Sequence, residues 1–343
     1  MARAERDSSA VALASRAPAA RPALRDPADE AMVARAHQRF AASRRRTKRR
    51  LRRARGGALP NLVVIGGLKC GTTSLHHYLN LHPEVQMSRP KELNFFVAEL
   101  NWPLGADWYA SHFHGGATVR GESSPHYTNR PRFEGVAERM RSVLGDARLI
   151  YMVRDPIDRM LSHYLHNVGG GYEGRPLADA FGDPESAYVQ RSRYFFQLEP
   201  YLEAFGGERI EIVPREELKR DRPGTMARVF AFCEVDPAFT SEEFEREWET
   251  GTAKAGGRFR IMDRAVRLPG LHVLDRSFDR LPESLRWLVE RIVHDPRAGE
   301  VPKPELPAGL RDRLRELLRD DVARLESFAG RRFGWLGQGD RSP

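Results

Sequence analysis

The sequence contains only two cysteines, Cys70 and Cys233, among 343 residues. Two cysteines cannot build a disulfide framework or a cysteine-rich zinc site. A reduced, intracellular setting fits this count, because disulfides persist mainly in oxidising compartments. No stretch reaches the roughly 18–20 apolar residues that a membrane span needs, and the N-terminus lacks the apolar run of a secretory signal. We therefore expect a cytoplasmic protein without a transmembrane segment.

Acidic residues are scarce at the N-terminus, and this scarcity explains the formal net charge of +9. Residues 1–60 hold 16 of the 56 Lys and Arg but only 5 of the 47 Asp and Glu. They therefore carry a net charge of +11, and the rest of the chain carries −2. The body lacks the basic excess typical of nucleic-acid-binding domains. We expect no nucleic-acid partner for the main domain.

Residues 1–57 are rich in Ala, Arg, Pro and Ser and poor in apolar side chains. Such a segment cannot bury enough surface to offset its conformational entropy, so we predict a basic, disordered tail followed by one domain over residues 58–338. A helix over residues 29–55 is compatible with the abundance of Ala and Arg. The run from Arg44 to Arg50 is either a solvated extension or a site for nucleic acid or anionic lipid.

The rest of the chain alternates apolar runs with helical segments. The expected strands are residues 61–67, 119–123, 148–153 and 209–213. The expected helices are residues 72–81, 131–144, 156–167 and 306–330. This alternation predicts an α/β fold, with a parallel sheet flanked by helices on both faces. Ligands then bind at the carboxyl ends of the strands.

A glycine-rich loop follows the first expected strand, and it reads Gly66-Gly67-Leu68-Lys69-Cys70-Gly71-Thr72-Thr73-Ser74. Backbone N–H groups at such a strand–helix junction form an anion site, to which a lysine adds charge. The loop differs from that of nucleoside triphosphatases, in which Lys directly follows a Gly and precedes Ser or Thr. Here Lys69 precedes Gly71 by two positions, and Thr72 occupies the place of that lysine. A structural turn with an incidental lysine is the alternative.

A second candidate phosphate site follows the third expected strand. Val153-Arg154-Asp155-Pro156 stands where that strand gives way to a helix, and Ser162 lies about two turns into the helix. Arginine suits a bidentate phosphate contact, and Arg154 and Ser162 could converge on one phosphate. The alternative is that Arg154 pairs with Asp155 or another carboxylate.

Together these motifs resemble the sulfotransferase superfamily, whose members carry a Lys-x-Gly-Thr-Thr-Ser loop after the first strand and an Arg with a downstream Ser at a later junction. The segment from Lys91 to Phe96 is similar to the Glu-x-x-Phe-Phe segment of heparan sulfate sulfotransferases and their bacterial relatives. The resemblance covers about residues 59–336. Further matching segments follow in order: Asp107-Trp108-Tyr109, Phe113, Gly121-Glu122-Ser123-Ser124-Pro125-His126-Tyr127, Ser192-Arg193-Tyr194, Gly256-Gly257-Arg258, Leu325, Gly330 and Trp335.

The resemblance implies a P-loop-like fold and a role for each matching residue. The sulfuryl donor would be 3′-phosphoadenosine 5′-phosphosulfate (PAPS), used without a metal. Glu92 would be the catalytic base, and Lys69 would stabilise the leaving phosphate. The implied donor-binding residues are Lys69, Cys70, Gly71, Thr72, Thr73 and Ser74 for the 5′-phosphosulfate, Arg154 and Ser162 for the 3′-phosphate, and Gly257 and Arg258 in a late loop.

Several alternatives stay open at this point. Glu122 and His126 are rival bases, and Glu122 could instead pair with Lys69. Many relatives have lysine where this chain has Ser123, so their acceptor preference does not carry over. The acceptor is a hydroxyl or amine of an unidentified glycan or small molecule, and the oligomeric state is not indicated. Competing functions are a nucleoside triphosphate-dependent kinase and a nucleic-acid-binding protein acting through the Arg-rich tail.

Four aromatic residues near Glu92 admit two interpretations. They could line an acceptor cleft, but core packing is favoured because aromatic side chains dominate protein cores. Cys70 likewise admits a redox role or a purely structural one, as a small residue in a tight loop. The four aromatic residues are Phe95, Phe96, Trp108 and Tyr109.

Overall fold

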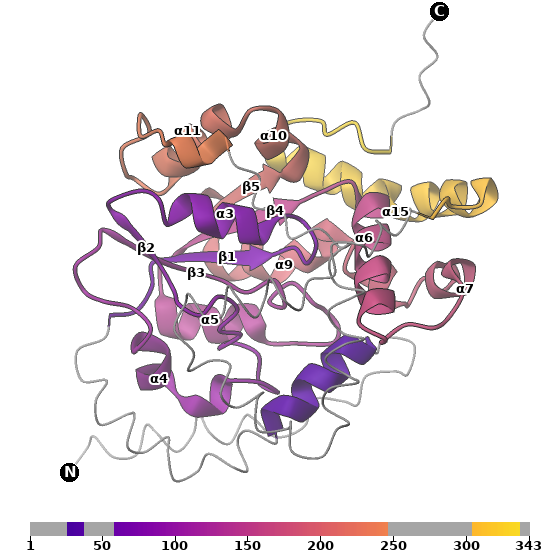
Figure 1. Cartoon of the computed structure of the whole chain (residues 1–343), viewed down its shortest axis with the longest axis horizontal. Helices are drawn as coiled ribbons and strands as arrows, with labels where there is room; N and C mark the ends of the chain where they lie inside the picture. The colour runs from indigo at the N-terminus through magenta and orange to yellow at the C-terminus, as the bar shows by residue number, and fades with distance from the viewer. Residues whose placement is uncertain (1–25, 38–57, 246–303, 337–343) are drawn as a thin grey trace, which may run out of the picture.

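Five parallel strands in the order β2-β3-β1-β4-β5 form the centre of the protein. The computed structural model describes residues 26–37, 58–245 and 304–336 (Figure 1). The strands are β1 (Leu62–Gly66), β2 (Val85–Met87), β3 (Val119–Ser123), β4 (Arg148–Val153) and β5 (Ile210–Pro214). The four expected strands correspond to β1, β3, β4 and β5, whereas β2 was not expected.

Strand β1 lies in the middle of the sheet, with all five of its residues buried. It pairs with β3 on one side, where Leu62 aligns with Gly121, and with β4 on the other, where Leu62 aligns with Arg148. Because the three strands are parallel, their carboxyl ends meet at one edge of the sheet. The loops that follow β1, β3 and β4 therefore meet there, as expected for ligand sites of open α/β sheets.

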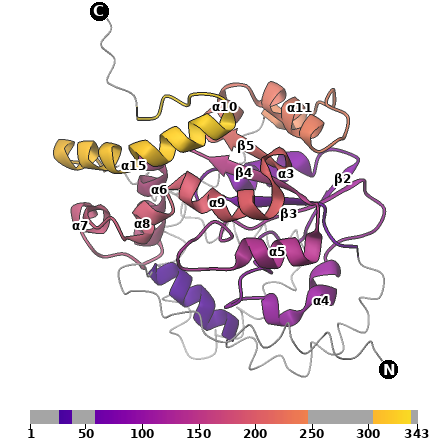
Figure 2. The same cartoon turned by 180° about the vertical axis from the view of Figure 1, so that it is seen from behind.

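Helices cover both faces of the sheet, as the alternation of segments predicted. Figure 1 shows α3 in front of the sheet, with α10 and α11 above it, and Figure 2 shows α5 and α9 on the opposite face. The long helix α15, near the end of the chain, packs against α9 and α6. The bounds are α3 (Thr72–Leu79), α5 (Val136–Leu144), α6 (Pro156–Gly169), α9 (Tyr194–Phe205), α10 (Arg215–Arg220), α11 (Arg222–Phe232) and α15 (Ala308–Ala329).

Shorter elements fill the connections. α8 and α7 contact each other, and α8 also packs beside α6. The short elements are η2 (Trp102–Leu104), α4 (Ala106–Ala110), α7 (Leu177–Gly182), α8 (Ala187–Gln190), η3 (Gly207–Arg209) and η4 (Glu242–Glu245). Within the described ranges, no helix combines the length and apolarity needed to cross a bilayer.

Residues 27–37 form a helix, which lies below α6 in Figures 1 and 2. Asp26, Asp29 and Val33 are buried, and Val33 joins the main core. This part of residues 1–57 therefore differs from the expected disordered tail, because its two carboxylates have buried partners elsewhere in the chain. The remainder, including the run from Arg44 to Arg50, lies outside the described residues.

Candidate active site

The loop between β1 and α3 turns through a left-handed glycine. Gly71 has φ 93° and stands just before α3, where no side chain caps the first turn. Glycine adopts this conformation without the cost that other residues bear. The uncapped N–H groups at the start of α3 form an anion site. Thr72 and Ser74 are buried in that first turn, and Thr73 is exposed.

The loop is anchored to the neighbouring strand. The N–H of Gly67 donates to the carbonyl of Met152 in β4 (2.7 Å), and the N–H of Cys70 donates to Gly67 (3.1 Å). Cys70 is buried with its Sγ 3.5 Å from the hydroxyl of Tyr194. Burial raises the pKa of the Cys70 thiol. The thiol is therefore protonated near neutral pH, which fits a structural role better than a redox role.

Lys69 lies in this loop with a left-handed backbone (φ 69°). Burial and the nearby Arg154 guanidinium together lower the pKa of its ammonium to about 8, while Glu92 opposes the change. Clustered positive charge of this kind favours an anionic ligand, which would restore the ordinary pKa of the lysine. Strain of a non-glycine residue is typical of functional sites.

Arg154 connects this loop to the start of α6. Its Nη1 lies 3.5 Å from the carbonyl of Lys69, and its Nη2 lies 3.6 Å from the carboxylate of Asp158. Its buried Nε has no hydrogen-bond partner among the described atoms. Asp155 caps α6 by accepting from the N–H of Asp158 (2.8 Å), so the carboxylate that pairs with Arg154 is that of Asp158 and not that of Asp155. Ser162 lies one turn beyond Asp158, half-buried on the same side of α6.

Beside the phosphate loop lies a pocket that was not predicted from the sequence. Three basic side chains from the region after β5 line the pocket, which makes it suited to an anionic ligand. Its lining residues are Gly71, Ser74, Tyr78, Arg215, Leu218, Lys219 and Arg222. The position of Arg215 directly after a buried strand was the available sequence signal.

Glu92 stands opposite the phosphate loop on a strained backbone (φ 65°). Its N–H donates to the carbonyl of Ser123 at the end of β3 (3.0 Å). Its carboxylate is 43% exposed and accepts from Lys91 Nζ at 2.7 Å. Burial opposes ionisation of Glu92, but Lys91 outweighs it and lowers the pKa of this carboxyl, an effect to which His126 adds only when it is protonated. Glu92 is thus an ionised, accessible carboxylate near Lys69.

Glu122 lies elsewhere, fully buried in the core. Its carboxylate accepts hydrogen bonds from Tyr109 (2.8 Å), Ser124 (2.6 Å) and Tyr127 (2.5 Å). Burial raises the pKa of Glu122 despite these bonds. A pairing with Lys69 is not among its contacts. These hydrogen bonds fit a structural role better than the role of a base.

Two histidines lie close to Glu92. His126 is 13% exposed, and its Nδ1 lies 3.5 Å from Asp29 Oδ1. His166, on α6 one turn beyond Ser162, was not predicted. Burial and the charge of Lys69 lower the pKa of His166 to about 4. The spacing of four residues between Ser162 and His166 was the signal for a shared helix face.

The aromatic residues near Glu92 lie mostly in the core. Phe95, Phe96 and Tyr109 are buried, with the rings of Phe95 and Tyr109 stacked at 4.4 Å, so these aromatics belong to the core. Gly257 and Arg258 lie outside the described residues. Within the described ranges, no group of three or more His, Cys, Asp or Glu side chains has the arrangement of a metal site.

Comparison with solved structures finds the same fold in a sulfotransferase from Alicyclobacillus acidocaldarius. The likeness has a TM-score of 0.57 and 24% identity, and it covers 81% of this chain and 99% of that one.

Sequence relatives match parts of longer proteins. A membrane-associated sulfotransferase, kil1, of Dictyostelium discoideum is 39% identical over 115 residues, which are 32% of this chain and 23% of that protein. A bifunctional heparan sulfate N-deacetylase/N-sulfotransferase of Caenorhabditis elegans is 25% identical over 68% of this chain and 28% of its own length. A mouse heparan sulfate glucosamine 3-O-sulfotransferase is 29% identical over 52% of this chain and 54% of its own length. The chain thus spans about a quarter to a half of these relatives.

The sulfotransferase domain family model matches residues 59–255, which is more than half of the chain. The match begins just before β1 and includes the phosphate loop, Glu92 and Arg154. The chain is therefore a transferase that belongs to the sulfotransferase domain family.

Proposed function

We propose that this protein transfers a sulfuryl group from PAPS to a hydroxyl or amine of a carbohydrate. The observation that carries the proposal is the contact between the Arg154 guanidinium and the backbone of Lys69. These residues follow the adjacent strands β4 and β1, and the ionised Glu92 lies nearby. Two of the relatives are heparan sulfate sulfotransferases, which favours a carbohydrate over another small molecule. Ser123, in the place of a lysine found in many relatives, leaves the choice between oxygen and nitrogen open.

The proposed reaction is an in-line displacement at sulfur. The acceptor oxygen or nitrogen forms a bond to sulfur while the bond from sulfur to the leaving phosphate oxygen breaks. The acceptor's proton passes to the carboxylate of Glu92. Negative charge grows on the leaving phosphate, where the ammonium of Lys69 stabilises it. Positioning and electrostatic stabilisation supply most of the rate enhancement in such transfers.

The donor is held at two ends in this proposal. The N–H groups and hydroxyls at the start of α3 bind the 5′-phosphate. Arg154 and Ser162 bind the 3′-phosphate, which ATP and AMP lack. The buried, unpartnered Nε of Arg154 fits such an anion, because a buried donor without a partner is costly. A kinase function is less favoured, since Lys69 is displaced from the position of a nucleoside triphosphatase lysine.

Calorimetry tests the donor assignment without needing the acceptor. The protein should bind 3′-phosphoadenosine 5′-phosphate, the desulfated product, far more tightly than AMP or ATP, and without magnesium. Arg154→Ala should weaken that binding by roughly 1.5–3 kcal/mol, as expected for one charged hydrogen-bonded contact. Arg319→Ala, at an exposed position on α15, is the control and should bind normally. Equal affinity for AMP would refute the 3′-phosphate site.

A further inference from the structure

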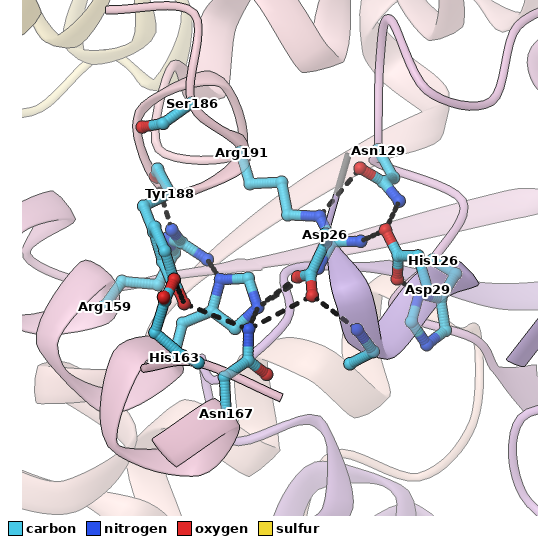
Figure 3. Close-up of polar contacts among 12 residues, drawn as sticks. Asp26, Asp29, His126, Asn129, Arg159, His163, Asn167, Ser186, Tyr188 and Arg191 are labelled. Atoms are coloured by element: carbon cyan, nitrogen blue, oxygen red, sulfur yellow. Dashed lines mark hydrogen bonds and ion pairs between the residues drawn. The ribbon is translucent and has the colours of Figure 1, made fainter. Parts of the chain in front are cut away.

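The segment of residues 26–37 inserts two carboxylates into the domain (Figure 3). Asp29 accepts from the amide of Asn129 at 2.9 Å and pairs with the guanidinium of Arg191. Arg191 in turn donates from Nε to the carbonyl oxygen of the Asn129 side chain at 2.7 Å. Asp26 and Asp29 each expose 2% or less of the residue. One charged partner, Arg191, and one neutral partner, Asn129, thus fix the carboxylate of Asp29.

The same carboxylate also faces His126. Asp29 Oδ1 lies 3.5 Å from Nδ1 of His126, and no described atom hydrogen-bonds to that buried nitrogen. This distance is longer than a direct hydrogen bond. Catalytic contacts of unliganded enzymes are often long and tighten in the complex. A carboxylate is a pure acceptor, so the contact favours a proton on Nδ1 and leaves the lone pair on Nε2.

The segment from the end of β3 to His126 also forms hydrogen bonds with the backbone around Glu92. The N–H of Glu92 donates to Ser123 (3.0 Å), and the N–H of Asn94 donates to the hydroxyl of Ser124 (3.0 Å). His126 follows two residues after Ser124. Glu92 and His126 lie close enough for each to shift the pKa of the other. In space, His126 therefore lies between Asp29 of the N-terminal helix and Glu92 of the candidate active site.

We propose that Asp29 is a positioning residue that fixes the ring of His126 beside Glu92, which makes the segment 26–37 part of the working enzyme. The proposal rests on the role of Glu92 as base. Burial lowers the pKa of His126 and so favours its neutral ring, which, with its Nδ1–H toward Asp29, adds no positive charge beside Glu92. The carboxylate of Glu92 therefore keeps more of its basicity than it would beside an imidazolium.

The charges that face His126 determine how it titrates. Burial lowers its pKa most, the carboxylates of Asp29, Glu92 and Asp26 raise it, and Arg191 lowers it. His166 is a further titratable neighbour. Removing the charge of Asp29 or Glu92 should therefore lower the pKa of His126 further.

Nuclear magnetic resonance of the ring nitrogens tests the contact on the full chain without any acceptor. The signal of His126 is assigned by its absence from His126→Gln. We expect the Nδ1–H tautomer in the unmodified protein and a mixture of tautomers in Asp29→Ala. The pKa of His126 should fall in Asp29→Asn and in Glu92→Gln, and it should not change in Asp312→Asn, an exposed control on α15. An Nε2–H tautomer in the unmodified protein, or a titration that Glu92→Gln leaves unchanged, would overturn the proposal even if Asp29 variants fail to fold.

Kinetics separate positioning from simple stability. The probe is PAPS with heparin freed of its N-sulfo groups. Asp29→Asn should lower kcat by roughly 10–10²-fold, the range for a misplaced catalytic group, with donor affinity unchanged. In a His126→Ala background, Asp29→Asn should change kcat by no more than about twofold, because both variants remove the same contact.

The kinetic outcomes distinguish two failures. If the effects of Asp29→Asn and His126→Ala multiply, Asp29 does not act through His126 and the positioning role is wrong. If the protein does not bind 3′-phosphoadenosine 5′-phosphate at all, the proposed function fails instead. The tautomer of His126 still decides whether Asp29 contacts the ring in that case.

Discussion

Asp26 Oδ2 lies 2.7 Å from Nε2 of His163, and both side chains are about 1% exposed. The pair joins the N-terminal segment to the middle of α6. Burial lowers the pKa of His163 to about 4, although the carboxylate opposes this. Burial also opposes the charge of Asp26, but His163 and Arg191 outweigh it and hold the pKa of that carboxyl well below its usual range. Arg191 supplies the permanent charge that the carboxylate needs.

This pair predicts a loss of stability in mild acid. An unfolded histidine titrates near pH 6.5, and folded His163 titrates near pH 4. Between these values the unfolded state binds more protons, so the free energy of unfolding falls as pH falls, by about 3 kcal/mol in total for His163. Urea unfolding at several pH values measures the slope. His163→Gln should make it less steep, with the remainder coming from other buried histidines such as His166.

A histidine elsewhere gives the control for that slope. His37 lies exposed on the N-terminal helix, so His37→Gln should leave the slope unchanged. Asp26 changes the free energy of unfolding only below about pH 4, where unfolded aspartates protonate. It therefore does not affect the slope measured between about pH 6.5 and pH 4. An unaltered slope in His163→Gln would mean that His163 does not titrate across this window.

Truncation predicts how much the N-terminal segment contributes. Removing residues 1–37 takes away Asp26 and Asp29 and leaves the guanidinium of Arg191 buried without its carboxylates. Breaking a buried ion pair from one side typically costs 3–5 kcal/mol. We therefore expect a loss of roughly that size in urea unfolding, whereas a chain that begins at Asp26 should retain its stability. Equal stability of the two truncated chains would contradict the importance of the buried carboxylates.

The sequence predicted the central sheet because its strands are continuous apolar runs that glycine or proline punctuates. β1 ends at Gly66 before the phosphate loop, and α6 begins at Pro156 directly after β4. Strand β2 has only three residues, too few for a periodic signal. Its pairing with β3 depends on contacts between distant segments, which no local pattern encodes.

The N-terminal segment shows the limit of composition as a guide. Asp26 and Asp29 look like solvated charges in a polar, arginine-rich sequence. Their burial depends on Arg191 and His163, which lie far away in the chain. The pocket beside Arg215 was missed for the same reason, because its lining comes from two distant regions of the sequence and its basic residues from only one of them. The phosphate loop, by contrast, is one contiguous motif.

The lowered pKa of Lys69, about 8, predicts a basic limb in the pH profile. In the proposed reaction the charged form of Lys69 binds the donor, so kcat/KM for PAPS should fall as pH rises through about 8, where free Lys69 loses its proton. Bound phosphates raise the pKa of Lys69, so kcat at saturating donor should hold to higher pH. Lys69→Arg should remove this limb, since arginine stays charged. A limb that persists in Lys69→Arg would belong to another group.

Loss of the Lys69 charge altogether should affect two measurable quantities. Lys69→Ala should weaken binding of 3′-phosphoadenosine 5′-phosphate in calorimetry and should also lower kcat. The two effects have one cause, because the ammonium faces both the bound phosphates and the leaving oxygen in the proposed reaction. Normal turnover with weakened binding would restrict Lys69 to a binding role.

The proposed base gives the sharpest prediction. Glu92→Gln keeps the size of the side chain and removes its basicity. If Glu92 accepts the acceptor's proton, kcat should fall by roughly 10²–10⁴, the range for general base catalysis. Affinity for 3′-phosphoadenosine 5′-phosphate should change little, because Glu92 is not assigned to the nucleotide. Rates with one acceptor at saturating PAPS measure the first effect, and calorimetry measures the second.

His126→Ala is the matched comparison, because His126 is the rival base near Glu92. A positioning role predicts a smaller loss than that of Glu92→Gln, since Glu92 remains able to take the proton. If the glutamine variant keeps near-normal turnover while His126→Ala is inactive, the histidine is the base. If both variants are inactive and both still bind the nucleotide, proton transfer needs the pair, and the Asp29 contact then orients a catalytic imidazole. Among these outcomes, only an inactive Glu92→Gln with a partly active His126→Ala supports Glu92 as the sole base.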